Sequence, residues 1–231
     1  MRLRLPEERP TEPPTGYKIA HAVLSQDGTR AAFTGVSLGG ALPYGVLADA
    51  SCAYGLRHRP PHRRCDCGFH CVHDRTAAEA LLCTADHRSA LLLEVTVLGA
   101  YIRFERGFRY ARQRVRTATA GPCACGATAT ALADAGWGRP GWRALAPVCA
   151  GCAQRRTAVS LAAFARLAGE GLRVRASGGT PPPGAEAGAG GPGPTVPELV
   201  AEAALLQARL DWFQTQLARL GERGGDGPAH G

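Results

Sequence analysis

Aromatic residues and lysine are scarce in this chain of 231 residues, and long apolar runs are missing. Aromatics make up 6% of the chain, and Lys18 is the only lysine among 27 basic residues. Glycine (30 residues) and proline (17) are abundant, and the longest apolar stretch, residues 90–97, is strand-sized and interrupted by Glu94. These properties exclude a membrane-spanning, a fibrous and a wholly disordered chain, and they argue against one large, well-filled core.

The start of the sequence also lacks the apolar run of a signal peptide, so we expect a cytoplasmic protein. The chain has nine cysteines, most of them in close pairs. In a reducing compartment, close cysteine pairs favour metal ligands over disulfides.

Familiar catalytic motifs are missing as well. The sequence has no His-Glu pattern of zinc proteases or deaminases, no phosphate-binding glycine loop and no nucleophile elbow. A catalytic zinc keeps one coordination position open and usually has a carboxylate base beside it. The sequence therefore predicts structural zinc and a protein that is not an enzyme.

The order of strand, turn and composition signals predicts an α+β chain of several parts. Residues 16–120 are expected to form a small β-rich domain held by a first zinc site, and residues 121–176 a unit like a zinc ribbon or treble clef. Residues 177–197 are rich in glycine and proline, which is typical of a flexible linker. A coiled-coil helix is expected over residues 198–221, after a capping box. Flexible tails are expected over residues 1–15 and 222–231.

Two hairpins and two helices are predicted inside the folded part. Apolar runs at residues 17–24 and 30–38 flank Asp27-Gly28, and strands at residues 91–104 and 108–117 flank a turn. A short helix is expected over residues 76–85, capped by Asp74 or Thr76. A second helix is expected over residues 153–168.

The strongest motif is a pair of cysteine pairs in the second unit. A Cys-x-Cys-Gly knuckle at Cys123, Cys125 and Gly126 precedes a Cys-x-x-Cys pair at Cys149 and Cys152. Two such pairs on separate turns converge on one tetrahedral zinc with four thiolates, and the glycine lets backbone N–H groups turn towards the sulfurs. We predict one zinc ion at these four cysteines.

A second Cys-x-Cys-Gly knuckle lies in the first unit. Cys65 and Cys67 form this knuckle, and Cys52 and His58 are the simplest upstream partners for a second zinc ion. Four further residues compete as ligands: His62, His70, Cys71 and His73. Cys83 lies in the apolar helix and is expected to be a small core residue.

The order of several short motifs carries a resemblance. These motifs are Gly16-Tyr17-Lys18, Ala50-Ser51-Cys52, His58-Arg59-Pro60-Pro61, Cys65-Asp66-Cys67-Gly68-Phe69, Val97-Leu98-Gly99 and Glu105-Arg106-Gly107-Phe108-Arg109. Residues 16–117 resemble small, uncharacterised zinc-binding proteins of actinobacteria, which share a Cys…His-x-x-Pro…Cys-x-Cys-Gly core followed by a Glu-x-Gly-aromatic-Arg hairpin. The resemblance implies Cys52, His58, Cys65 and Cys67 as ligands and implies no activity. The sequence departs from the pattern at Cys71, where a small residue is expected.

The second hairpin is rich in arginine and aromatic side chains. The formal net charge of the chain is +8, and all of the positive excess lies in residues 51–176. Alternate residues of a strand project from one face, which suits contacts with the phosphates of DNA or RNA. The candidates are Arg103, Arg109, Arg112, Arg114 and Arg116. The alternative is a ribbon whose arginines are simply solvated.

The predicted C-terminal helix has an apolar heptad pattern. Its a and d positions include Leu199, Leu206, Leu210, Phe213, Leu217 and Leu220. Such a stripe is typical of a homodimeric coiled coil or of pairing with a partner helix. Packing of the helix onto its own domain is the alternative.

These features together predict a non-enzymatic, zinc-binding regulator or adaptor. Nucleic acid is the expected ligand and homodimerisation the expected assembly. Two alternatives stay open: a protein–protein scaffold that binds no nucleic acid, and a thiol or zinc redox sensor.

Overall fold

The structure, a computed structural model, describes residues 12–36, 42–52, 55, 57–154 and 156–177. This part of the chain is β-rich with few helices. Its ten strands are β1 (Thr15–Ser25), β2 (Ala31–Gly35), β3 (Leu47–Asp49), β4 (Phe69–Val72), β5 (Leu91–Phe104), β6 (Gly107–Ala120), β7 (Ala131–Arg139), β8 (Trp142–Val148), β9 (Ala158–Ser160) and β10 (Arg173–Ala176). The helices are α1 (Arg75–Ala80), α2 (Ala150–Ala153) and α3 (Leu161–Ala168), with short 3-10 turns η1 (Leu81–Cys83) and η2 (Ala85–His87) after α1.

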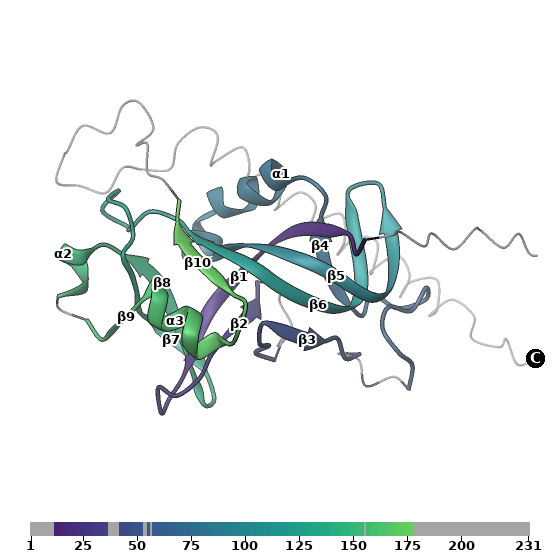
Figure 1. The fold of residues 1–231 in the computed structure, drawn as a ribbon, viewed down its shortest axis with the longest axis horizontal. Coiled ribbons are helices and arrows are strands. Elements are labelled where there is room, and N and C mark those ends of the chain that lie inside the picture. Colours follow the sequence, from purple (N-terminus) through teal and green to yellow (C-terminus); the bar gives the residue numbers. More distant parts are fainter. Residues whose placement is uncertain (1–11, 37–41, 53–54, 56, 155, 178–231) are drawn as a thin grey trace, which may run out of the picture.

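All ten strands belong to one sheet, which is built around β1 and the long β5–β6 hairpin (Figure 1). The first half of β1 pairs with β5, its second half pairs with β8, and β2 pairs along its other edge. Strands β4, β3 and β10 follow one another along the free edge of β6. The β10–β6 pairing is parallel.

The sheet joins the stretches 16–120 and 121–176, which the sequence suggests as separate units. Strand β8 of the second stretch pairs with β1, and β10 pairs with β6 of the first. Both contacts join residues far apart in the chain, and hydrophobic periodicity within a single segment carries no information on such pairing.

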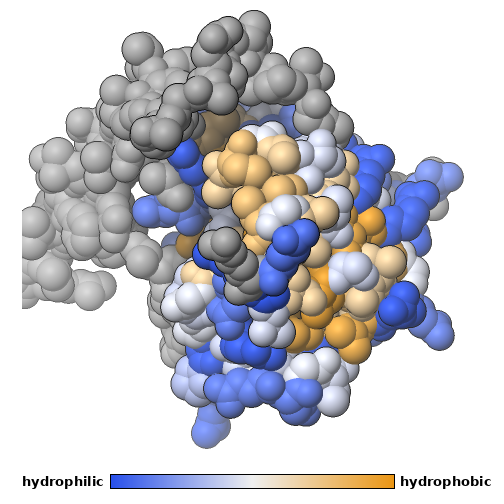
Figure 2. Space-filling view, turned by 90° about the vertical axis from the view of Figure 1, so that its left-hand side faces the viewer, coloured by the Kyte–Doolittle hydropathy of each residue, from blue (hydrophilic) through white to orange (hydrophobic). Residues whose placement is uncertain are grey.

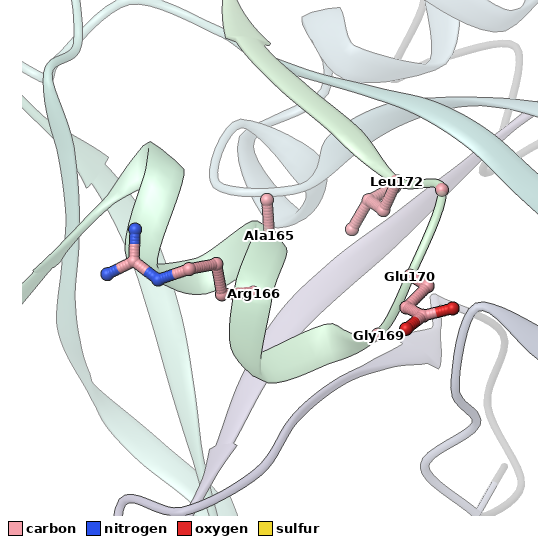
Figure 3. A pocket seen from close by; sticks show the side chains of 6 residues that line it. Ala165, Arg166, Gly169, Glu170 and Leu172 are labelled. Atoms are coloured by element: carbon pink, nitrogen blue, oxygen red, sulfur yellow. The ribbon is translucent and has the colours of Figure 1, made fainter.

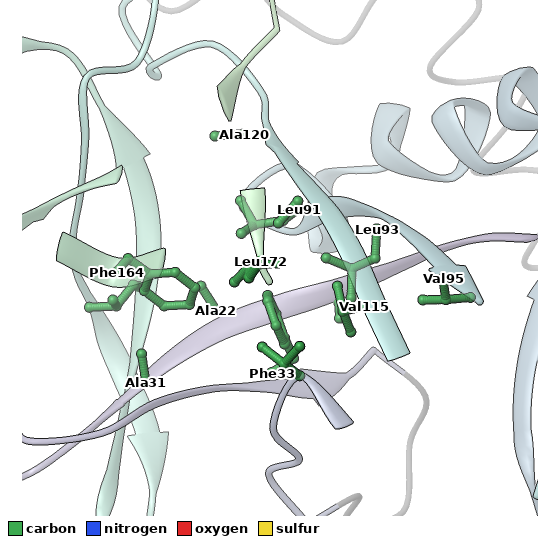
Figure 4. Close-up of a cluster of buried hydrophobic side chains, with 14 of the residues drawn as sticks. Ala22, Ala31, Phe33, Leu91, Leu93, Val95, Val115, Ala120, Phe164 and Leu172 are labelled. Atoms are coloured by element: carbon green, nitrogen blue, oxygen red, sulfur yellow. The ribbon is translucent and has the colours of Figure 1, made fainter. Parts of the chain in front are cut away.

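The main core lies on one face of the sheet and is largely aliphatic. Figure 4 shows its centre, where Phe33 of β2, Leu93 of β5 and Val115 of β6 meet Phe164 of α3 and Leu172. A smaller cluster on the opposite face packs α1 against the sheet through Ala78, Ile19 and Leu92. Aliphatic side chains make up most of both clusters, and the main core also buries Phe33, Phe108, Tyr110 and Phe164.

Both predicted hairpins are present. The first turns at Gly28, which has φ +73°, a left-handed conformation that glycine adopts without steric cost. The second joins β5 and β6 at the predicted turn. Helix α1 is shorter than predicted, and its cap is Asp74, whose Oδ2 accepts a hydrogen bond from the backbone N–H of Ala77 at 2.7 Å.

The helix predicted over residues 153–168 is wrong in its first part. Helix α2 ends at Ala153, and β9 then pairs with β7 before α3 begins at Leu161. Ser160 caps α3, because its Oγ accepts a hydrogen bond from Ala163 N at 3.1 Å. A β-branched residue at Thr157 and another at Val159 favour the short strand.

The predicted C-terminal helix and its heptad residues lie outside the described residues, as do most of the predicted linker and both predicted tails. Within the described part, no helix is both long and apolar enough to cross a membrane.

Candidate metal centres

The first cluster brings together the loop after β3 and the knuckle that leads into β4. Cys52, His58, Cys65 and Cys67 place their ligand atoms within 4.8 Å of one another. The Sγ atoms of Cys52 and Cys65 are 3.9 Å apart, and His58 Nε2 lies 3.1 Å from Cys67 Sγ. Sulfurs that share one tetrahedral zinc at about 2.3 Å are separated by about 3.8 Å. The three thiols and the imidazole therefore fit a zinc ion.

A buried arginine holds the loop of the first cluster. Arg109 of β6 is 6% exposed and reaches from the sheet into the loop. Its Nη1 donates to the carbonyl oxygen of Cys65 at 2.7 Å and to Asp66 Oδ1 at 3.1 Å, and its Nη2 donates to the carbonyl oxygen of His62 at 3.2 Å. A planar guanidinium with several donors suits such a fork of acceptors. Arg109 thus fixes the backbone of the knuckle from behind.

The four competing residues lie outside the first cluster. His62 stacks on His58 at 4.4 Å between ring centroids, and its Nδ1 accepts a hydrogen bond from Arg64 N. His70 is exposed on β4, and Cys71 is buried in the main core. His73 Nε2 lies 3.0 Å from the carbonyl oxygen of Phe104. The ligand set expected from spacing is the set that the structure brings together.

The second cluster joins the loop before β7 to the turn after β8. Cys123, Cys125, Cys149 and Cys152 place their Sγ atoms within 4.8 Å of one another, and those of Cys125 and Cys149 are 3.6 Å apart. Gly126, at φ +87°, closes the knuckle and donates its N–H to the carbonyl oxygen of Cys123 at 2.7 Å. This separation again matches two thiolates on one tetrahedral zinc.

The two ends of the second cluster are held by short, local structure. Cys149 is the N-cap residue of α2, and its carbonyl oxygen accepts a hydrogen bond from Ala153 N at 3.0 Å. A small apolar cluster at Cys123, Ala133 and Val148 packs the knuckle onto β7 and β8. The second cluster is thus an edge feature of the sheet.

The four thiols of the second cluster cannot all ionise alone. Burial raises the pKa of Cys123, but N–H donors at Cys125 and Cys149 and the thiols of Cys125 and Cys152 outweigh it and bring this pKa down to about 6. Hydrogen bonds to the sulfurs of Cys149, Cys123 and Cys125 raise the pKa of Cys152 to about 12. A thiolate cluster of this kind needs a cation to ionise completely at neutral pH.

The first cluster shows the same need for a cation. Burial raises the pKa of Cys67, and the nearby sulfurs of Cys65 and Cys52 act in the same direction. The two separate clusters therefore fit two zinc ions. When bound, zinc supplies positive charge and folding free energy to loops that have little core of their own.

The sequence-predicted arginines of the second hairpin separate into two groups. Arg112, Arg114 and Arg116 alternate along the central part of β6, and Arg112 and Arg116 are exposed. Arg103 is exposed near the end of β5. Arg109 differs from them because it is buried beneath the first cluster, where its guanidinium donates to His62, Cys65 and Asp66, so it does not face solvent as a phosphate contact would.

Cys83 also differs from its prediction. It is exposed in η1 rather than buried in a helix, because α1 ends at Ala80. Two exposed arginines that the sequence analysis does not single out, Arg173 and Arg175, lie on β10, which pairs with β6. Their signal is the alternation of Arg-Val-Arg-Ala directly after Leu172.

A pocket of about 300 Å³ lies between the end of α3 and β10 (Figure 3). Its lining contains two charged side chains, Arg166 and Glu170, which point away from each other. They do not converge on a common point, and no cysteine or histidine lines the pocket.

A scan against protein-family models and searches of curated proteins and of solved structures find no match to this chain.

Proposed function

We propose that this protein is a non-enzymatic zinc-binding regulator or adaptor of the cytoplasm that binds nucleic acid through an arginine face on β6 and β10. The arginine face consists of Arg112, Arg114 and Arg116 on β6 and Arg173 and Arg175 on β10. The observation that carries the proposal is that pairing across the sheet points all five side chains away from the main core.

The pairing register supports a common face for the three arginines of β6. Val95 and Val115 are register partners and both belong to the main core. The next pair, Thr96 and Arg114, therefore projects from the opposite face, because successive side chains of a strand alternate. Arg116 Nε donates to Thr96 Oγ1 at 3.0 Å, which places Arg116 on the same side.

The same reasoning adds the arginines of β10. Val174 packs against the main core and is the register partner of Ala118, which is a core residue. Arg173 and Arg175 flank Val174, so they project from the face opposite the core. Arg175 Nε also donates to Thr119 Oγ1 on β6 at 3.4 Å. A parallel strand thus extends the arginine row of β6.

Acidic side chains offset this positive charge only in part. Asp49 Oδ1 lies 3.4 Å from Arg112 Nε, and both side chains are exposed, so water screens their attraction. Glu94 lies between the core residues Leu93 and Val95, so its side chain projects from the same face as the arginines. With both zinc ions and their thiolates counted, the net charge of the chain falls from +8 to about +5. The arginine face remains positive.

The spacing of the arginines suits phosphates along one strand. Alternate residues of a strand are about 6.7 Å apart, which is about the rise of two nucleotides in one strand of a duplex at roughly 3.4 Å each. A flat row of guanidinium groups contacts phosphates and reads few base edges. We therefore expect binding with little sequence preference.

The experiment compares two triple variants of the full-length, zinc-loaded protein. Fluorescence anisotropy measures affinity for a labelled DNA duplex and for a labelled single-stranded RNA over a series of salt concentrations. The variant Arg112→Ala, Arg114→Ala, Arg116→Ala should bind more weakly. Its affinity should also depend less on salt, with the negative slope of log affinity against log salt becoming shallower by about 2–3.

The matched control is Arg30→Ala, Arg75→Ala, Arg166→Ala, which removes the same charge from two exposed positions and one half-buried position outside the arginine face. It should leave the slope nearly unchanged. An equal loss in both variants, or no change in either, would exclude the arginine face as the binding surface. The protein–protein scaffold would then be favoured.

Self-association through residues 198–221 is the second part of the proposal, and its support is the heptad pattern of the sequence. A native mass spectrum of the full-length protein, purified without chelator, counts chains and metal ions together. Two chains, each with two zinc ions, are expected. A monomer that stays monomeric at micromolar concentration would contradict this part alone.

A further inference from the structure

Exposure of sulfur distinguishes the two clusters. In the second cluster, Cys125 and Cys152 are exposed, Cys149 is half-buried and Cys123 is buried. In the first cluster, Cys52 and Cys65 are half-buried and Cys67 is only 4% exposed. Figure 2 views the end of the molecule that carries α2 and β9, where hydrophobic surface reaches solvent between hydrophilic side chains. A small reagent in water therefore meets the second cluster first.

The second cluster also holds the exposed Cys125 close to the sulfur of Cys149. Cys125 Sγ and Cys149 Sγ are 3.6 Å apart, whereas Cys52 Sγ and Cys65 Sγ are 3.9 Å apart. Cys125 lies in a knuckle closed by the short hydrogen bonds of Cys123 and Gly126. No buried side chain comparable to Arg109 of the first cluster holds this knuckle among the residues for which contacts are described. To form an S–S bond of about 2.05 Å, the two sulfurs have to approach each other by about 1.5 Å.

We propose that the second cluster is an oxidation site for hydroperoxides, in which Cys125 and Cys149 form a disulfide while the first cluster keeps its ion. Susceptibility of cysteine to peroxide follows thiolate character and exposure. The two clusters share the first property when loaded with zinc and differ in the second. The first cluster is then a permanent part of the fold, and the second is a site of reversible modification.

The chemistry needs one molecule of hydrogen peroxide. The thiolate of Cys125 attacks one peroxide oxygen, so that an S–O bond forms, the O–O bond breaks and hydroxide leaves. The thiolate of Cys149 then attacks Cys125 Sγ, so that the S–S bond forms and the S–O bond breaks. A second hydroxide leaves, and both hydroxides take up protons to give water. Two electrons pass from the two sulfurs to the peroxide.

The disulfide leaves Cys123 and Cys152 as the only thiolates of the second cluster. Two ligands hold zinc far more weakly than four, so the ion is expected to leave. The knuckle and α2 then lose their common attachment, although the small apolar cluster at Cys123, Ala133 and Val148 still packs there. Pairing of β8 with β1 and β7 does not depend on these sulfurs. The change is therefore confined to one end of the sheet.

The experiment adds one to two equivalents of hydrogen peroxide to the full-length protein loaded with two zinc ions. A chromophoric zinc chelator reports metal release over time, and peptide mass spectrometry after differential alkylation maps each cysteine. We expect about one zinc ion per chain to be released, at least about tenfold faster than any second ion. The expected product is the Cys125–Cys149 disulfide, with Cys52, Cys65 and Cys67 still reduced. Reduction with added zinc should restore the starting state.

The control variant is Cys83→Ser, which removes an exposed cysteine that belongs to neither cluster. It should release zinc as the unaltered protein does. The proposal is overturned if peroxide that oxidises Cys83 releases no zinc. It is also overturned if both ions leave at the same rate, or if the disulfide joins a different pair. None of these outcomes depends on nucleic-acid binding, so the two proposals fail separately.

Discussion

The same four-residue knuckle, Cys-x-Cys-Gly, is embedded in two different environments. At the first cluster, Gly68 has φ +124°, and a Cβ added there would lie 3.1 Å from Arg109 Cγ and 3.2 Å from the carbonyl oxygen of Tyr110. At the second, Gly126 has φ +87°, and an added Cβ would meet nothing within 4 Å. The motif thus determines the ligands in both places, and the surrounding sheet determines how strongly each site is tied to the fold.

Replacement of one ligand in each cluster should give the largest difference. We expect Cys67→Ser to lower the free energy of unfolding by at least about 4 kcal/mol, and Cys125→Ser by about half as much, because Cys67 is buried at the sheet and Cys125 is exposed. Urea unfolding followed by circular dichroism, together with a count of bound zinc, measures both effects. Equal losses of stability would contradict the difference between the clusters.

Removal of the buried guanidinium should show that Arg109 stabilises the fold, whereas the arginines of the arginine face do not. Arg109→Ala takes the guanidinium donors away from the carbonyl oxygens of Cys65 and His62, and His62 keeps only the N–H of Cys65 at 3.1 Å. We expect a loss of about 3 kcal/mol. Arg112→Ala, on an exposed side chain of the same strand, should change stability by less than about 0.5 kcal/mol. Arg109→Lys should recover only part of the loss, since an ammonium does not reproduce the fork.

Substitution of the two knuckle glycines, Gly68 and Gly126, tests how firmly each cluster is tied to the fold without changing a metal ligand. Gly68→Ala combines a left-handed φ with close contacts, so a loss of about 2–3 kcal/mol is expected. Gly126→Ala has only the left-handed φ to overcome and should cost about 1 kcal/mol. Thermal unfolding of the two zinc-loaded variants decides the order. A larger effect at Gly126 would mean that crowding around Gly68 relaxes easily.

Much of the candidate site could be predicted from the sequence. The ligand set of the second cluster follows from spacing, because four ligands near one ion need short loops and two turns, and both are visible in a linear sequence. At the first cluster, spacing gives the simplest set and leaves His62, His70, Cys71 and His73 as competitors. The two main hairpins follow from turn residues between apolar runs. Both features depend on residues that are close together in the sequence, so a single segment contains the information that predicts them.

The remainder depends on contacts between distant segments. The role of Arg109 arises because β4 pairs with β6 and brings residues 62–66 over its side chain. The arginine face includes β10 only because residues 173–176 pair with residues 117–120. Strand β9 is similar, since its pairing with β7 overrides the helical pattern of the segment. A single sequence predicts which side chains of a strand share a face, but it does not predict which other strand pairs with that strand.

A final, smaller effect concerns the strand that continues from the first knuckle. Phe69 follows Gly68, and the Nζ of Lys18 lies 5.0 Å from the Phe69 ring centroid and 5.1 Å from that of Tyr44. Burial lowers the pKa of Lys18 from 10.5 to about 8, although the nearby Cys71 acts in the opposite direction. Between these two values the unfolded chain binds more protons than the folded one, so the contribution of Lys18 to stability rises with pH. At neutral pH the charged ammonium is therefore a cost to folding.

Lys18→Met should remove that cost and raise stability at pH 7 by about 1–2 kcal/mol. It should also flatten the rise in stability that Lys18 gives between pH 8 and 9. Urea midpoints of the two proteins at pH 7, 8 and 9 measure both effects. The residues around the second cluster contain no lysine, so the pH dependence of zinc retention there should be the same in both proteins. If Lys18→Met instead destabilises the protein at pH 7, the attraction between the ammonium and the two rings outweighs its desolvation.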